Sequence, residues 1–121
     1  MVRRADRPAR SGCPIAATLD VVGDRWSLVI IRDMINGKAR FGEFLESPER
    51  ITTNVLTDRL AQMEQAGLVD RIAYQQRPPR FEYRLTGKGH ALLPVVQEMC
   101  RWANRFVPDT WVPPESFMTK P

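Results

Sequence analysis

The 121-residue sequence predicts one mainly α-helical domain that carries a small β-hairpin. Apolar residues recur at helical spacing in several stretches between residues 13 and 106, as expected for helices with a buried side. Residues 69–76 and 81–85 alternate instead, and two prolines separate them, which is typical of two strands joined by a loop. With 43% hydrophobic and 26% charged residues, the composition is that of a single globular domain.

Composition divides the chain into three regions. Residues 1–12 form a basic arm that we expect to be flexible, because it holds four arginines against Asp6 and shows no apolar periodicity. Residues 13–107 contain the predicted helices and strands, and residues 108–121 form a proline-rich C-terminal tail. The net charge is +4, but the arm alone contributes +3, so the global charge is weak evidence for a nucleic-acid partner.

Several classes of protein are not expected from this sequence. No apolar run approaches the roughly 20 residues that span a bilayer. No apolar segment of the kind that a secretory signal requires follows the first arginines, so we expect a cytoplasmic protein without membrane contact. Two cysteines and one histidine cannot complete a four-ligand zinc site within one chain, and no metal or other cofactor is predicted. Without a Cys-x-x-Cys pair or a glycine-rich phosphate loop, an enzyme is not expected.

Three helices are predicted in the first part of the domain. The first covers residues 13–22, with a proline tolerated near its start, and Gly23 ends it. Asp24 caps the second, because its carboxylate can accept hydrogen bonds from the free amides of the first turn. Residues 26–35 are apolar on nearly every side, so this helix should be central. Residues 40–47 are long enough for about two further turns.

The stretch Ile51–Val69 predicts a helix whose N-cap is Thr52 and whose C-terminal stop is Gly67. Residues 48–50 are a short break before it, so the two helices have the spacing of a helix-turn-helix. The residues predicted to face outward are Thr53, Asn54, Thr57, Asp58, Arg59 and Gln62. Short hydroxyls, an amide and an arginine suit a surface that approaches base edges and phosphates, although many polar helix faces meet only water.

The predicted hairpin carries a basic loop. Pro78 and Pro79 cannot donate to a strand ladder, so residues 77–80 are predicted to form a stiff projecting loop with an arginine on each side. Between Arg71 and His90 the sequence has five basic residues and a single acidic residue, Glu82. Such a loop has the shape of a wing that straddles a DNA backbone, and the alternative is an exposed hairpin with ordinary surface charge.

The last predicted helix covers residues 87–106 and is capped by Thr86. Pro94 lies inside it and should bend it or displace its start. Its apolar stripe is larger than one small sheet can cover, so it should pack against a second copy of the chain, together with the helix at residues 13–22. Trp111 and Phe117 in the tail either pack across that partner or belong to a frayed end.

Taken together, the motifs resemble the HxlR-type transcriptional regulators, winged helix-turn-helix proteins related in architecture to the MarR group. The resemblance covers roughly residues 13–106. It rests on Cys13-Pro14, Gly23-Asp24-Arg25-Trp26, Arg40-Phe41, Ile51-Thr52-x-x-Val55-Leu56-Thr57-x-Arg59-Leu60, Gly67-Leu68-Val69-x-Arg71 and Pro78-Pro79-Arg80-Phe81-Glu82-Tyr83-x-Leu85-Thr86-x-x-Gly89.

The resemblance implies a bacterial homodimer that binds double-stranded DNA at a pseudo-palindromic operator. It places at the major groove Thr52, Thr53, Asn54, Thr57, Asp58 and Arg59, and at the wing Arg77 and Arg80. Many relatives are apolar at the position of Arg77, so the charge there is a departure. The alternative function is a winged-helix module that binds protein and not DNA.

Two cysteines raise the question of an effector. The family includes redox and electrophile sensors that act through a cysteine at the position of Cys13, so we hypothesise that Cys13 is a thiolate sensor near a helix N-terminus. Cys100 of the other subunit could resolve its oxidation. The alternative is that both are buried small hydrophobic residues without a sensing role. The effector would then be something else, such as a small molecule.

Overall fold

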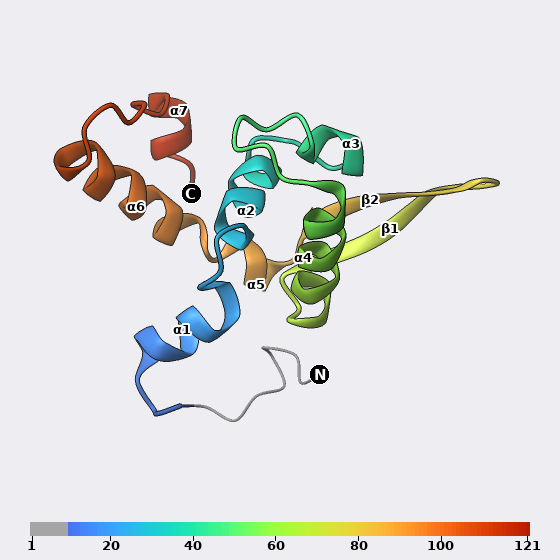
Figure 1. The fold of residues 1–121 in the computed structure, drawn as a ribbon, viewed down its shortest axis with the longest axis horizontal. Helices are drawn as coiled ribbons and strands as arrows, with labels where there is room; N and C mark the ends of the chain where they lie inside the picture. Colours follow the sequence, from blue (N-terminus) through green and yellow to red (C-terminus); the bar gives the residue numbers. More distant parts are fainter. Residues whose placement is uncertain (1–9) are drawn as a thin grey trace.

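The computed structural model describes residues 10–121, which form helices around a central helix and one long β-hairpin that projects from them (Figure 1). The fold is mainly α with a two-stranded antiparallel sheet, as predicted. The elements are α1 (Pro14–Val22), α2 (Ser27–Ile35), α3 (Phe41–Phe44), α4 (Thr53–Gln65), β1 (Val69–Gln76), β2 (Pro79–Leu85), α5 (Gly87–His90), α6 (Leu93–Phe106) and α7 (Glu115–Met118).

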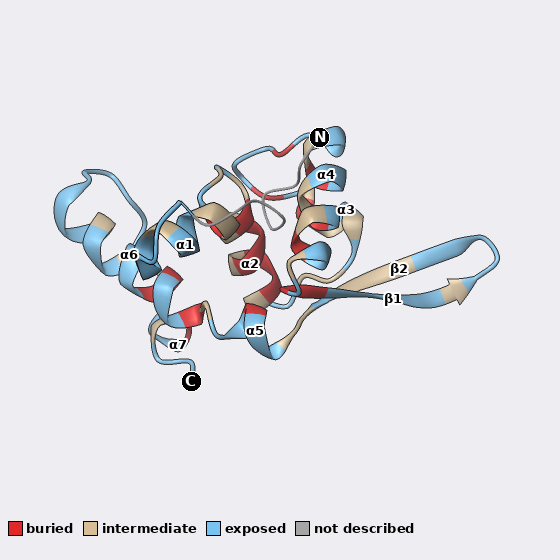
Figure 2. Cartoon of the chain, turned by 90° about the horizontal axis from the view of Figure 1, so that it is seen from below, coloured by how far each residue is buried: buried red, intermediate tan, exposed pale blue. Residues whose placement is uncertain are grey.

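The main core lies where α2 meets α3, α4 and the start of β1. Ile30 and Ile31 of α2 are buried against Phe44 of α3 and against Leu56 and Leu60 of α4. Figure 2 shows this buried zone running through α2 and the inner side of α4, while the hairpin is exposed over most of its length. The central position of α2 confirms the prediction from its nearly all-round apolar sequence.

Thr52 is the N-cap of α4 as predicted, whereas the N-cap of α2 is Trp26 and Asp24 acts from two residues before it. The Asp24 carboxylate accepts hydrogen bonds from the backbone N–H groups of Trp26 and Ser27, each at 2.9 Å. The Thr52 hydroxyl accepts from the N–H of Val55 at 3.4 Å, and Gly67 follows α4 with a φ of 78°, which glycine adopts without strain. These local signals set the boundaries of α2 and α4.

The hairpin is longer than predicted. Val69 pairs with Leu85 and Gln76 pairs with Pro79, so β2 begins at Pro79 and not at Phe81. Placing residues 77–80 outside the sheet was therefore wrong for Pro79 and Arg80. Pro79 is tolerated because it is the first residue of the strand, where a missing N–H costs little.

The C-terminal helical region is interrupted. The single helix predicted for residues 87–106 is wrong, because a break at residues 91–92 separates α5 from α6. Pro94 lies in the first turn of α6, where its missing N–H is tolerated, so the proline displaces a helix start, which was one of its two predicted effects.

Part of the proline-rich tail is ordered against its own chain. Phe117 in α7 is only 6% exposed and packs with Leu93 and Val96 of α6. The buried Gln97 side chain donates to the backbone carbonyls of Phe117 and Lys120, both at 3.1 Å. Phe117 therefore neither frays nor packs across a partner, whereas Trp111 is 73% exposed.

The predicted flexible arm, residues 1–12, lies largely outside the described residues. Of its four arginines only Arg10 is described, and it folds back on α1, where it donates to the Asp20 carboxylate at 2.8 Å. No helix within residues 10–121 is long and apolar enough to cross a membrane.

Candidate nucleic-acid interface

Helix α4 presents a polar face on the side away from the core. Thr52, Thr53, Asn54, Thr57 and Asp58 are all exposed, while the opposite side of the helix buries Leu56, Leu60 and Met63. Three residues separate the end of α4 from the start of the projecting hairpin (Figure 1). The structure thus brings the predicted major-groove residues together on one surface.

The exposed side chains differ in how far they are already engaged. The Thr57 hydroxyl donates to the Thr53 carbonyl at 2.9 Å. The side chain of Asn54 makes no hydrogen bond within residues 10–121, so its amide can both donate and accept toward a ligand.

Arg59 is held against the body of the protein. Its guanidinium lies 2.7 Å from the Asp58 carboxylate and 3.6 Å from that of Asp24, and its side chain is only 15% exposed. Asp58 also accepts from the Gln62 amide, and the hydrogen bond from Arg59 is the main reason that the pKa of Asp58 lies below its usual value. A base contact by Arg59 therefore requires the guanidinium to turn away from these carboxylates.

Asp24 combines the cap of α2 with the restraint on Arg59. Burial opposes ionisation of Asp24, but hydrogen bonds from the Ser27 hydroxyl and from two backbone N–H groups, together with the Arg59 charge, outweigh it and lower its pKa. Asp24 thus stays ionised at neutral pH and links the start of α2 to the middle of α4.

The turn before α4 is tied to α2 by an ion-pair network. Arg32 donates to the two carboxylate oxygens of Glu49 at 2.6 and 2.8 Å, and this lowers the pKa of Glu49. Arg32 also contacts Asp33 at 2.8 Å, and the buried Asp33 accepts from the Ser47 hydroxyl. Arg50 has a φ of 61°, a left-handed conformation that is uncommon outside glycine, so this turn is tightly constrained.

The hairpin is fixed at its base and free at its tip. The N–H of Tyr83 donates to the Ala39 carbonyl at 2.7 Å, and the Tyr83 ring packs edge-on against Phe44 with a centroid separation of 6.4 Å. Arg77 and Arg80 lie at the far end and are exposed. A rigid base with two exposed cations at the tip suits contact with phosphate groups.

The two cysteines have different surroundings. Cys13 is exposed and precedes the first turn of α1. Cys100 is half-buried on the side of α6 that faces α2, and burial raises the pKa of its thiol. The alternative that both cysteines are buried is not met within the single chain, where Cys13 is exposed and Cys100 is half-buried.

Sequence reasoning missed the residues that hold this surface in place. Asp24 was predicted only as a cap, and neither the Arg32–Glu49 pair nor the Asp33–Ser47 contact was predicted. The partners are between 14 and 35 positions apart in the sequence. Besides that predicted capping role, only the run Gly23-Asp24-Arg25-Trp26, quoted for the family resemblance, drew attention to Asp24.

The fold and this surface define a class of protein. Two helices joined by a short turn, the second with a polar outer face beside a projecting basic hairpin, form a winged helix-turn-helix. The sequence model of the HxlR-like helix-turn-helix family matches residues 21–110, and the chain belongs to this family. Its relatives include the HTH-type transcriptional regulators YybR and YdeP of Bacillus subtilis.

The similarity extends over most of each relative. YybR is 42% identical over 106 residues, which is 86% of this chain and 85% of YybR. The structure of the redox regulator HypR in its reduced form has a TM-score of 0.72 and 40% identity, covering 82% of this chain and all of HypR. Reduced YodB from B. subtilis, also a transcriptional regulator, has a TM-score of 0.67 and 34% identity, covering 84% of this chain and all of YodB. These relatives are regulators and not enzymes.

Proposed function

We propose that the protein is a homodimeric regulator that binds a pseudo-palindromic DNA operator in the cytoplasm. The observation that supports it most directly is the exposed polar face of α4 together with the basic tip of the projecting hairpin. In this proposal Thr52, Thr53, Asn54, Thr57, Asp58 and Arg59 face the major groove, and Arg77 and Arg80 contact the flanking backbone.

The residues are proposed to divide their roles. Asn54 can bond an adenine edge with its amide, and the threonine hydroxyls and methyl groups can contact neighbouring bases or phosphates. Asp58 and Asp24 orient Arg59, so Arg59 would reach DNA only after it leaves one of them. Arg77 and Arg80 would contribute affinity without sequence preference.

Dimerisation is proposed from the apolar surface of α1 and α6. A single chain leaves large hydrophobic side chains exposed on both helices, namely Ile15, Leu19, Val95, Met99, Trp102 and Phe106. Large apolar side chains exposed on two helices favour an interaction surface there. A two-fold arrangement about it would allow two copies of α4 to enter successive major grooves, about 34 Å apart.

The test is binding to labelled duplex DNA at increasing salt. Wild-type affinity should fall with a log–log slope of about 0.9 for each phosphate contact, and Arg80→Ala should reduce that slope by about one. Asn54→Ala should weaken operator binding more than binding to random DNA. Lys120→Ala is the matched control, because it removes one positive charge from the exposed C-terminal end, away from α4 and the hairpin. Salt-independent behaviour with no retention of duplex DNA would favour the protein-binding alternative.

We also propose that Cys13 is a redox or electrophile sensor. The exposed Cys13 beside the start of α1, and the likeness to the redox regulator HypR, support this role. With hydrogen peroxide as oxidant, the Cys13 thiolate attacks one peroxide oxygen and becomes a sulfenic acid, while hydroxide leaves. The thiolate of the partner subunit's Cys100 then attacks the sulfenic sulfur, forms a disulfide and releases hydroxide, which takes up the proton lost from that thiol as water.

Oxidised protein should run as a disulfide-linked dimer on a non-reducing gel. Neither Cys13→Ser nor Cys100→Ser should form that species, and dithiothreitol should reverse it in the wild type. An unmodified mass after mild peroxide treatment, together with unchanged DNA affinity, would end the sensing proposal and leave the DNA-binding proposal intact.

A further inference from the structure

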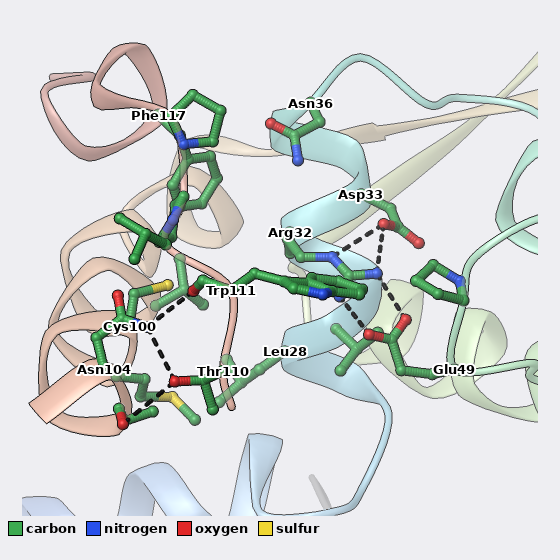
Figure 3. Close-up of a pocket in the computed structure, with 18 of the residues that line it drawn as sticks. Leu28, Arg32, Asp33, Asn36, Glu49, Cys100, Asn104, Thr110, Trp111 and Phe117 are labelled. Carbon is green, nitrogen blue, oxygen red and sulfur yellow. Dashed lines mark hydrogen bonds and ion pairs between the residues drawn. The ribbon is translucent and has the colours of Figure 1, made fainter. Parts of the chain in front are cut away.

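A pocket of about 930 Å³ lies between α2, α6 and the segment at residues 109–114 (Figure 3). No residue of α4 lines it. Its walls are mainly apolar, with Leu28 of α2, Val96 and Met99 of α6, and Trp111 and Phe117 from the C-terminal end of the chain. Both the volume and the mostly apolar lining fall within the range of small-molecule sites.

The charged groups around the pocket sum to a negative charge. Its lining includes two cations, Arg32 and Lys38, and three carboxylates, Asp33, Glu49 and Asp109, which gives a net charge of −1. The chain as a whole carries +4, so the pocket differs in sign from the molecule around it. This negative charge favours a cation over an anion as the bound ligand.

The two cations are already engaged, and one carboxylate is not. Arg32 contacts Glu49 at 2.6 Å and Asp33 at 2.8 Å, and the Lys38 ammonium group donates to the Ser47 hydroxyl at 3.2 Å. Within residues 10–121 the Asp109 side chain has no hydrogen bond or ion pair. At Arg32 an incoming anion would have to displace a carboxylate, and at Lys38 it would compete with the Ser47 hydroxyl, whereas an incoming cation meets an unused carboxylate at Asp109.

Trp111 adds an aromatic surface at the same place. Figure 3 shows its side chain reaching across the pocket toward Arg32 and Glu49. Its backbone is fixed, because the Asn104 amide donates to the Trp111 carbonyl at 2.8 Å, while the side chain remains open to solvent. An indole face close to carboxylates is the usual recognition surface for organic cations.

We propose that this pocket binds lipophilic organic cations, that is, molecules with an aromatic or aliphatic body and one quaternary or protonated centre. The body would pack on the apolar walls, and the positive centre would lie between the Trp111 ring, Asp109 and Glu49. Binding of this kind does not depend on the DNA-binding role.

Glu49 provides a route from the pocket to α4, and this consequence rests on the proposed function. Glu49 lies in the turn before α4, and its carboxylate is held by Arg32. A cation that draws Glu49 away from Arg32 loosens the tie between that turn and α2. Ligand binding should therefore change the affinity for operator DNA.

The test uses two probes of nearly equal shape and opposite charge, tetraphenylphosphonium and tetraphenylborate. Isothermal titration of the full chain without DNA should show the phosphonium bound at least about tenfold more tightly than the borate. Equal affinity or the reverse order would overturn the charge assignment. If neither probe binds, the proposed site is refuted. This holds also if the reason is that a partner subunit fills the pocket.

Two matched variants locate the effect. Asp109→Asn removes the unused carboxylate and keeps a residue that tolerates the left-handed φ of 65°. It should weaken phosphonium binding about fivefold or more without changing the thermal melting curve. Glu115→Gln removes an equal charge from α7 outside the pocket lining and should leave phosphonium binding as in the wild type. Equal effects of the two variants would refute a specific site.

A final arm separates this proposal from the proposed function. Operator binding is measured with and without saturating phosphonium. If the phosphonium binds and the protein does not bind DNA at all, the pocket stands and the regulatory role fails. If operator DNA binds but neither probe does, the regulatory role stands and the pocket proposal fails.

Discussion

Replacement of Asp24 tests the link between the central helix and α4. Asp24→Ala removes the acceptor for the backbone N–H groups of Trp26 and Ser27, a loss of about 1 kcal/mol for a helix cap. It also leaves the buried Ser27 hydroxyl without its Asp24 acceptor, which costs about 1 kcal/mol or more. The lost Arg59 pair, mostly shielded from solvent, adds about 1 kcal/mol.

The sum is a loss of about 3 kcal/mol in the free energy of unfolding, which lowers Tm by roughly 10 °C for a domain of this size. Thermal and urea unfolding followed by circular dichroism measure it. Asp24→Asn is the matched variant, because its amide oxygen can still accept the cap hydrogen bonds and only the charge is lost, so about 1 kcal/mol is expected. An alanine variant within about 0.5 kcal/mol of wild type, or an asparagine variant as unstable as alanine, would refute this reasoning.

Three further outcomes follow from the same structure. Because the folded-state pKa of Asp24 is lowered, the stabilisation that its charge provides is complete above the unfolded pKa near 4 and is lost as pH falls through the folded value. Urea unfolding curves of wild type and Asp24→Asn should therefore differ at pH 7 and converge below about pH 4. Leu56→Ala removes a fully buried side chain of α4 and should lower the free energy of unfolding in urea by about 3 kcal/mol. This difference from wild type should be the same at pH 4 and at pH 7. Gly89→Ala places a Cβ 2.1 Å from the Leu68 carbonyl oxygen and should lower Tm by roughly 10 °C or prevent folding, whereas Gly87→Ala, with open space around its Cβ, should melt within a few degrees of wild type; similar melting of both variants would contradict the packing at the base of β2.

Much of the fold is readable from local patterns in the sequence. The boundaries of α2 and α4 follow from Asp24, Thr52 and Gly67, because a cap or a left-handed stop acts on the residues next to it. The division of the C-terminal helix was only half predicted. Pro94 indicates that a helix start is displaced, but the sequence does not say that α5 and α6 part at residues 91–92.

The remaining features depend on contacts between distant residues. Phe117 belongs to an aperiodic, proline-rich segment, and it is buried only because Leu93 and Val96 of α6 pack against it. The restraint on Arg59 arises because the fold brings Asp24 beside α4. The pocket is made by α2, α6 and residues 109–114 together, and no single stretch of sequence carries its signal.

Selection of bound sequences from a randomised duplex library tests the central claim most directly. The account predicts that wild-type protein enriches an inverted repeat whose half-sites are centred one helical turn, or a multiple of one turn, apart. It also predicts that Asn54→Ala relaxes the preference at one position of each half-site, while Lys120→Ala enriches the wild-type repeat. No enriched repeat, or the same repeat from Asn54→Ala, would contradict the assignment of α4 as the helix that reads DNA.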